Sequence, residues 1–303
     1  MTKNPDLISS PTPHLPGDGD TTQKVMTDVI IALTPATLAG IYFFGKDALV
    51  LIFVSVFTAI IIESVFTGRT GSLREVLGDG SAIVTGLLLA LSLPPGLPWG
   101  IAAFGSAAAI ILGKIVFGGL GNNIFNPALV GRALLVAIWP VQMTTWLSPV
   151  DATTTATPLS GGEAGYLEMF VGSIPGCIGE TSALLLIIGA IYLFYRERIT
   201  WHVPAGYLGS IVVLSPIIGT DILFQLLAGG LILAAFYMAT DMVTSPVTEK
   251  GQIIFGIGCG VGTIVIREFA SLPGGVTYAI LLMNAFTPLL DKYFPRRAFG
   301  EVK

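Results

Sequence analysis

The sequence predicts an all-α, polytopic membrane protein of about ten transmembrane helices, arranged as an inverted repeat with about five helices in each half. Three observations support this fold class. The chain of 303 residues is 53% hydrophobic and only 11% charged, whereas soluble domains carry about 25% charged residues. Apolar segments of spanning length recur along the chain, and its mean hydropathy is +0.81. A short stretch in the first half also resembles one in the second half.

The predicted helices follow a polar N-terminal tail. Residues 1–24 are rich in Pro, Gly and Asp and contain no apolar run, which indicates a flexible tail rather than a cleavable signal. Residues 25–291 form the predicted transmembrane domain, and residues 292–303 form a C-terminal tail. The third span runs from "DGSA" to "LPP" and is short, so we expect it to be tilted or broken. The predicted spans are residues 25–45, 48–66, 80–94, 98–117, 126–146, 181–196, 203–219, 221–240, 252–268 and 273–291.

The distribution of lysine and arginine predicts the orientation of the chain. If the N-terminus is cytoplasmic, only Lys46 and Arg267 of the 15 positive residues fall on the outer side. Such an excess is typical of cytoplasmic segments, and Arg132 is counted among them. We therefore expect both tails to be cytoplasmic and the long loop, residues 147–180, to be extracytoplasmic.

An internal repeat supports the predicted symmetry. Residues 95–105, "PGLPWGIAAFG", align without gaps on residues 246–256, "PVTEKGQIIFG". Farther on, "NPALV" from Asn126 lines up with "NAFTP" from Asn284. An odd number of predicted spans separates the two copies, so the copies should have opposite orientations. Inverted repeats place functional sites at the interface between the repeats.

Three groups of polar residues interrupt the apolar segments in corresponding regions of this repeat. Polar groups are costly in hydrocarbon and usually face the interior of a bundle or a cavity. For a single residue, hydrogen bonding between helices or capping of a helix explains the position equally well. For three groups together, a shared ligand or ion pathway is an equal alternative. The groups are Asn122, Asn123 and Asn126 with Arg132; Asp241, Thr244 and Ser245; and Asn284 with Thr287.

The long loop contains an unusual run of threonines. The segment "DATTTATPL", Asp151 to Leu159, holds four threonines between Asp151 and Thr157. Hydroxyl side chains that form turns are one explanation. A threonine hydroxyl can also form a phosphoester and so carry a covalent group. The spacing alone leaves both explanations open.

This segment resembles the flavinylation motif D-x-x-[ST]-G-A-T of bacterial membrane redox complexes. In that motif a flavin transferase joins FMN through its phosphate to the last threonine, which is Thr157 here. Asp151 and Thr154 occupy the motif's first and fourth positions, and Thr155 replaces its glycine. Asp151 is expected to serve recognition by the transferase.

Longer stretches resemble the same family. They are residues 19–33, 79–95, 118–135, which read "GGLGNNIFNPALVGRALL", 238–251 and 272–291. The chain is similar to the D subunits of Rnf electron-transport complexes. The B subunits of sodium-pumping NADH:quinone reductases are the nearest alternative, but they carry a longer N-terminal region.

The resemblance implies a subunit of the bacterial inner membrane that helps to pass electrons between NAD and ferredoxin while ions cross the membrane. It implies covalent FMN at Thr157 and, as partners, the other subunits of the complex, the flavin transferase and lipid. The asparagine and aspartate groups would line an ion path or hold a second, noncovalent flavin such as riboflavin. A channel or transporter without redox chemistry and a purely structural subunit are the alternatives.

Other kinds of site are not expected. Cys177 and Cys259 lie in no metal-binding spacing, and His14 and His202 form no ligand pair. No basic stripe indicates nucleic acid. No nicotinamide or iron–sulfur motif occurs, so we predict no catalytic residues and no complete enzyme activity for this chain alone.

Overall fold

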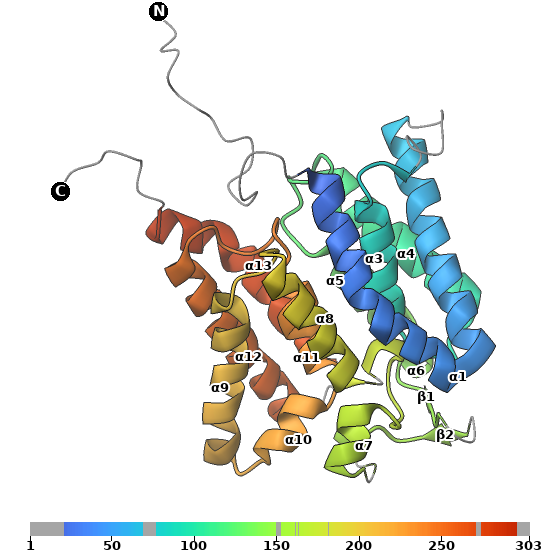
Figure 1. Ribbon diagram of the computed structural model, residues 1–303, viewed down its shortest axis with the longest axis vertical. Helices are drawn as coiled ribbons and strands as arrows, with labels where there is room; N and C mark the ends of the chain where they lie inside the picture. The colour runs from blue at the N-terminus through green and yellow to red at the C-terminus, as the bar shows by residue number, and fades with distance from the viewer. Residues whose placement is uncertain are drawn as a thin grey trace, which may run out of the picture.

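The computed structural model describes residues 21–68, 77–149, 153–160, 162, 164–180, 182–270 and 274–295. It is a bundle of helices, and a single two-stranded sheet occurs in the described residues (Figure 1). Helices start or end near two faces of the bundle. We call the face with Thr22 and Tyr293 the terminal end, and the opposite face, which holds the loop between α5 and α8, the loop end.

The first two predicted spans lie in one hydrogen-bonded element, α1, Thr22–Thr67. Its two legs run in opposite directions and meet at the loop end (Figure 1). The turn occurs at Gly45, where φ is 64° and ψ is −140°. An L side chain is strained in this conformation, so the sequence places glycine at the turn.

The third span is short, as predicted, because α3 covers only Ser81–Leu91. The backbone from Ser92 to Pro98 is not helical, and α4, Trp99–Gly113, then leads to the 3-10 turn η1, Ile115–Phe117. Helix α5, Pro127–Ile138, begins where the Asn126 side chain accepts a hydrogen bond from the Leu129 N–H. Proline at the first helical position suits this start, because its missing N–H has no partner there anyway.

The second half begins with α8, Ala183–Tyr195, and α9, His202–Ile218. The predicted eighth span, like the third, is not one continuous helix, and it consists of several short elements. Two long helices end the bundle. The elements of this half are, after α9, α10 Ile222–Leu227, α11 Leu231–Leu233, the π-helical η4 Ala234–Met238, α12 Glu249–Phe269 and α13 Gly275–Tyr293. Each half thus has a short or broken third element, which agrees with the predicted repeat.

The helical, membrane-spanning class is confirmed. Among the described residues, three elements are long and apolar enough to cross a membrane, namely α1, Trp99–Phe117 and α12. Shorter apolar helices accompany them, and every predicted span contains helix. Many large apolar side chains, such as Phe53 and Ile217, are exposed on the outside of the bundle, as expected where lipid surrounds it.

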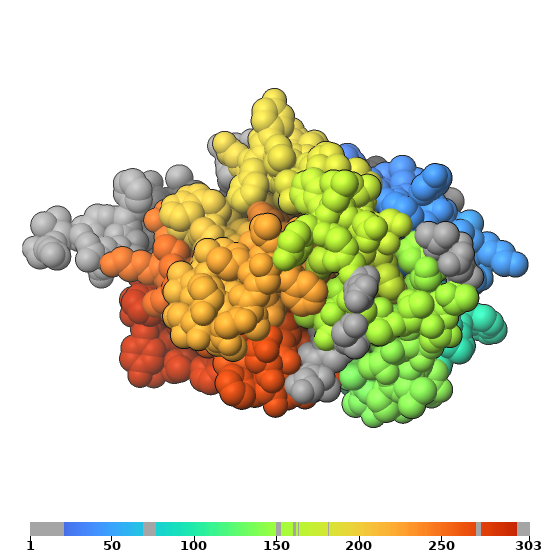
Figure 2. All heavy atoms as spheres, turned by 90° about the horizontal axis from the view of Figure 1, so that it is seen from below, coloured from blue at the N-terminus to red at the C-terminus, as the bar shows by residue number. Residues whose placement is uncertain are grey.

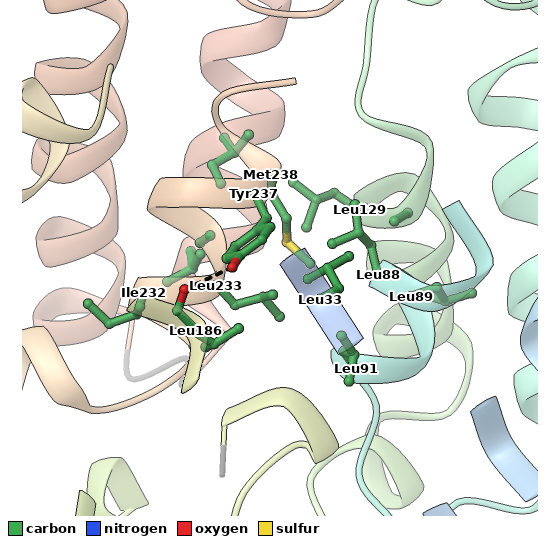
Figure 3. Packing of buried hydrophobic residues seen from close by; sticks show 14 of the residues in the cluster. Leu33, Leu88, Leu89, Leu91, Leu129, Leu186, Ile232, Leu233, Tyr237 and Met238 are labelled. Carbon is green, nitrogen blue, oxygen red and sulfur yellow. Dashed lines mark hydrogen bonds between the residues drawn. The ribbon is translucent and has the colours of Figure 1, made fainter. Parts of the chain in front are cut away.

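One hydrophobic core joins the two halves (Figure 3). Leu33, Leu88 and Leu129 of the first half pack with Leu233 and Met238 of the second. Within this core the Tyr237 hydroxyl donates a hydrogen bond of 2.8 Å to the Leu186 carbonyl oxygen. This bond satisfies a polar group that would otherwise be buried without a partner.

A charged cluster joins the halves at the terminal end. The buried Asp28 carboxylate of α1 accepts hydrogen bonds from Arg198 Nε at 2.6 Å and from the Tyr192 hydroxyl at 2.8 Å. Arg196 Nε lies 3.3 Å from the same carboxylate. These contacts fix the first helix of one half to the end of the first helix of the other.

The loop between α5 and α8 forms a folded cap on the bundle. It contains α6 Pro140–Met143, β1 Trp146–Leu147, β2 Thr154–Thr155, η2 Pro158–Ser160, α7 Tyr166–Val171 and η3 Ile178–Glu180. Figure 2 views the loop end, where the green and yellow-green atoms of this segment cover much of the surface beside α10.

Candidate functional site

The threonine run divides into an exposed part and a buried part. Thr154 and Thr155 form β2, which pairs antiparallel with Trp146 and Leu147, and both threonines are exposed. Thr157 turns inward and is only 6% exposed. Asp151 lies outside the described residues. The structure therefore separates the predicted acceptor, Thr157, from its threonine neighbours.

Backbone contacts hold Thr157 in this buried position. The Gly162 N–H donates a hydrogen bond of 2.9 Å to the Thr157 carbonyl oxygen. A Cβ atom at position 162 would lie 2.5 Å from the Ala156 carbonyl oxygen. This contact is too close for any side chain, so the turn requires glycine at this position.

Thr157 lines a small cavity of about 20 Å³ at the loop end. Arg132 of α5, Glu180 of η3 and Gly229 line the same cavity, together with apolar side chains that include Trp146. The cavity has room for little more than one water molecule. It brings together residues that are far apart in the sequence, from the first half, the long loop and the second half.

Arg132 is buried inside the bundle, with 9% of its surface exposed. Its Nη1 donates hydrogen bonds to the Ser92 carbonyl oxygen, at the end of α3, and to Cys177 Sγ at 3.3 Å. Its Nε has no hydrogen-bond partner among the described residues. The charge count grouped Arg132 with the charges of the two tails, whereas its side chain lines the Thr157 cavity at the loop end.

A second cavity, of about 80 Å³, lies between the halves near the terminal end. Three of the predicted site residues, Asn123, Asn126 and Asp241, line it. The buried Asn123 Oδ1 has no hydrogen-bond partner among the described residues. The charged side chains of Lys114 and Arg198 also line this cavity. These asparagines and the aspartate therefore meet in space.

Asn126 and Asn284, which the repeat aligned with each other, are in direct contact. The Asn126 N–H donates to Asn284 Oδ1 at 3.1 Å, and both residues are buried. The two side-chain amides bind different carbonyl oxygens. Asn126 Nδ2 donates to the Met238 carbonyl oxygen, and Asn284 Nδ2 donates to the Thr244 carbonyl oxygen, each at 3.2 Å. Asn126 therefore links the first half to the second through hydrogen bonds to Asn284 and Met238.

The other predicted residues have local partners. Asn122 is exposed, and its side chain bonds weakly to the Gly118 carbonyl oxygen at 3.4 Å. Ser245 is buried next to Thr244 and does not line the cavity. Asp241 accepts hydrogen bonds from the Val243 N–H at 3.3 Å and the Thr244 hydroxyl at 3.2 Å.

Sequence reasoning missed a buried ion pair beside this cavity. Lys114 Nζ lies 2.7 Å from Glu63 Oε2 and also donates to the Ser81 hydroxyl, which in turn donates to Asp79. Lys114 and Glu63 are 3% and 6% exposed. Each interrupts an apolar run, "ILGKIVF" and "IIIESVF". A charge within a spanning segment was the available signal.

Comparison with known proteins extends over nearly the whole chain. The model of the NQR2, RnfD, RnfE family matches residues 8–300. The D subunit of a proton-translocating ferredoxin:NAD+ oxidoreductase complex from Clostridium ljungdahlii is 44% identical, over 98% of this chain and 97% of the relative. The D subunit of a Na+-translocating ferredoxin:NAD+ oxidoreductase complex from Acetobacterium woodii is 43% identical, over 98% and 96%. The D subunit of an ion-translocating oxidoreductase complex from Halorhodospira halophila is 37% identical, over 92% of each chain.

Proposed function

The chain belongs to the NQR2, RnfD, RnfE family, and from this premise we propose that it is the D-type membrane subunit of an ion-translocating ferredoxin:NAD+ oxidoreductase complex. The observation that carries the proposal is identity above 40% over nearly the full length of two relatives with that role. The relatives are named for protons and for Na+, so the proposed transported ion is a monovalent cation. The other subunits of such a complex are the proposed partners.

Loss of the chain from its own cells tests this role. Inverted membrane vesicles of the deletion strain should lose ion uptake driven by reduced ferredoxin and NAD+, and the restored gene should return it. A tagged chain should also copurify with the other subunits. Ion uptake that is unchanged in the deletion strain would contradict the proposal.

The second part of the proposal is covalent attachment of FMN to Thr157. The neighbouring residues suit a phosphoester at this position, because Thr157 offers a hydroxyl and Arg132, which lines the same cavity, has an N–H without an acceptor among the described residues. The cavity itself is far smaller than the roughly 300–1,000 Å³ of ordinary ligand pockets. The flavin ring would therefore lie outside this cavity.

Attachment requires a donor with an activated flavin phosphate, such as a flavin dinucleotide. The Thr157 oxygen displaces the nucleotide from the flavin phosphorus, so one phosphoanhydride bond breaks and one phosphoester bond forms. The hydroxyl proton leaves to solvent, and no electrons are exchanged. Once bound, FMN supplies one-electron transfer chemistry. The chain contributes the attachment point and the mainly apolar side chains around it.

A transferase can reach Thr157 only if the segment around it opens. The residue is buried, whereas the threonines of β2 are exposed. We therefore place the modification before the loop packs on the bundle or during its transient opening. The strand pair that precedes Thr157 has only two residues in each strand, and we propose that this segment opens locally while the helices stay folded.

Matched variants test the choice of acceptor. Thr157→Val should remove the ultraviolet fluorescence of the denatured chain in a gel, whereas Thr154→Val should keep it. Valine has nearly the shape of threonine, so the fold should tolerate both changes. A fluorescent Thr157→Val chain would show that another residue carries the flavin.

The cavity at the terminal end is the proposed ion path. Its size of about 80 Å³ suits a few waters or an ion rather than a second flavin such as riboflavin. Asp241, Asn123 and Asn126 supply oxygen ligands to it. In the vesicle assay, Asp241→Asn should lower ion uptake while the chain keeps its covalent flavin. Unchanged uptake would exclude this path.

A further inference from the structure

Arg132 is a buried cation with too few hydrogen-bond acceptors. A guanidinium has five N–H donors. Among the described residues, the hydrogen bonds of Arg132 reach only the Ser92 carbonyl oxygen and the Cys177 sulfur. Thiol sulfur is a weak acceptor, and the Arg132 Nε bonds to nothing described. A buried donor without an acceptor costs free energy unless another group supplies the acceptor.

The surroundings of Arg132 supply little negative charge. Glu180 lines the same cavity and interacts electrostatically with Arg132, but it also interacts with Arg267. Its Oε2 already accepts a hydrogen bond from the Cys177 N–H at 3.3 Å. Glu180 is therefore shared between two buried guanidinium groups, and Glu268 also acts on Arg267. Among the described residues, Arg132 thus has no carboxylate to itself.

Thr157 is the residue that could carry an anionic group next to Arg132. It lines the cavity beside Arg132, and its own backbone is fixed there by the bond from Gly162. The cavity between the two residues holds about one water molecule, so a phosphate on Thr157 requires the loop to shift outward. The phosphate oxygens would then offer negative charge and hydrogen-bond acceptors to the Arg132 donors. Arginine binds phosphate with two parallel N–H donors, which gives both strength and a fixed orientation.

We propose that Arg132 is the positioning residue for the phosphate that links the flavin to Thr157, and that this pairing locks the loop onto the bundle after modification. The inference rests on the proposed attachment at Thr157. It assigns Arg132 two roles in sequence. Before attachment, the side chain holds the end of α3 through the Ser92 carbonyl oxygen. After attachment, it also binds the phosphate and so keeps the flavin from swinging with the loop.

The competing explanation is that Arg132 only holds α3 in place. The two explanations differ in how the effects of the side chain and of the flavin combine. Independent effects on stability add, whereas groups in contact show an interaction energy. The experiment therefore measures the midpoint of thermal unfolding, Tm, for four samples of the full chain. These are the wild type and Arg132→Gln, each from cells with and without the flavin transferase.

Flavin attachment should raise the Tm of the wild type and leave that of Arg132→Gln unchanged. The anisotropy of the flavin fluorescence should fall in Arg132→Gln, because the flavin then moves freely. Equal gains in Tm in both chains would overturn the proposal. A fluorescent gel band and the added mass of the modified peptide are recorded for every sample, so failure of attachment itself is seen separately.

Two controls keep the result specific. Arg198→Gln removes another buried arginine, one that lies at the terminal end and whose Nε donates to the Asp28 carboxylate at 2.6 Å. It should lower Tm equally with and without flavin. If Arg132→Gln does not fold, Arg132→Lys replaces it, because lysine keeps the charge but lacks the two parallel N–H donors of arginine. The rise in Tm on flavin attachment should then be smaller than in the wild type. A gain equal to that of the wild type would contradict the proposal.

Discussion

Lys114 and Glu63 illustrate at the scale of single residues what a charge inside the bundle requires. The pair is nearly sealed from solvent, at a separation of 2.7 Å, and Ser81 satisfies a further donor of the lysine. Burying two charges costs several kcal/mol for each, which their attraction and hydrogen bonds offset only while both are present. The loss of one partner should therefore be worse than the loss of both.

We predict that Lys114→Met lowers the free energy of unfolding by about 3–5 kcal/mol, because it removes the cation paired with the buried Glu63 carboxylate. The double variant with Glu63→Met should be more stable than Lys114→Met alone. Thermal unfolding in detergent measures which of the two variants is more stable. Lys250→Met, at an exposed position of α12, is the control and should change stability by less than about 0.5 kcal/mol. A double variant less stable than the single one would contradict this explanation.

At the scale of elements, the sequence predicted where helices occur better than how they are joined. Length and apolar composition determine a span, so each predicted span contains helix. The hydrogen-bonded continuity of α1 through Gly45 and the π-helical turn of η4 depend on packing between segments. The burial of Thr157 depends on Gly162 and on residues of other elements. Local sequence carries no signal for such contacts, and the motif alone could not reveal that its acceptor is hidden.

The turn in α1 gives a prediction for Gly45. Gly45→Ala should lower the free energy of unfolding by about 1–3 kcal/mol, because alanine is strained at positive φ with this ψ. Among the described residues, no atom lies within 4 Å of a Cβ at this position, so the change in stability should come from the backbone conformation. Gly100→Ala is the matched control, since Gly100 is helical and also has open space around it. It should be neutral or stabilising. Equal effects of the two changes would refute the conformational explanation.

At the scale of the whole molecule, the fold places two cavities that contain polar and charged side chains near opposite ends of an apolar bundle. One cavity contains Thr157 and Arg132, and the other contains Asn123 and Asp241. The two asparagines that the repeat alignment matched, Asn126 and Asn284, are in contact at the interface between the halves. The charge count grouped Arg132 with the charges of the two tails, because a count cannot tell a buried arginine from one in a loop between helices. The orientation of the two ends is a proposal that labelling can test.

We predict that the loop end is extracytoplasmic. Thr154→Cys, on exposed β2, should react with a membrane-impermeant maleimide in intact cells. Glu249→Cys, exposed at the terminal end, should react only after the membrane is opened. Cys177 and Cys259 are both buried, so the wild type should remain unlabelled. The reverse pattern of labelling would invert the topology.

The most direct test of the central claim is peptide mass spectrometry of the wild-type chain, purified under denaturing conditions from cells that contain the flavin transferase. We predict a fluorescent band whose Thr157-containing peptide carries the mass of FMN on that residue. A dark band with an unmodified Thr157 peptide would contradict the claim that this chain is a covalent flavin subunit.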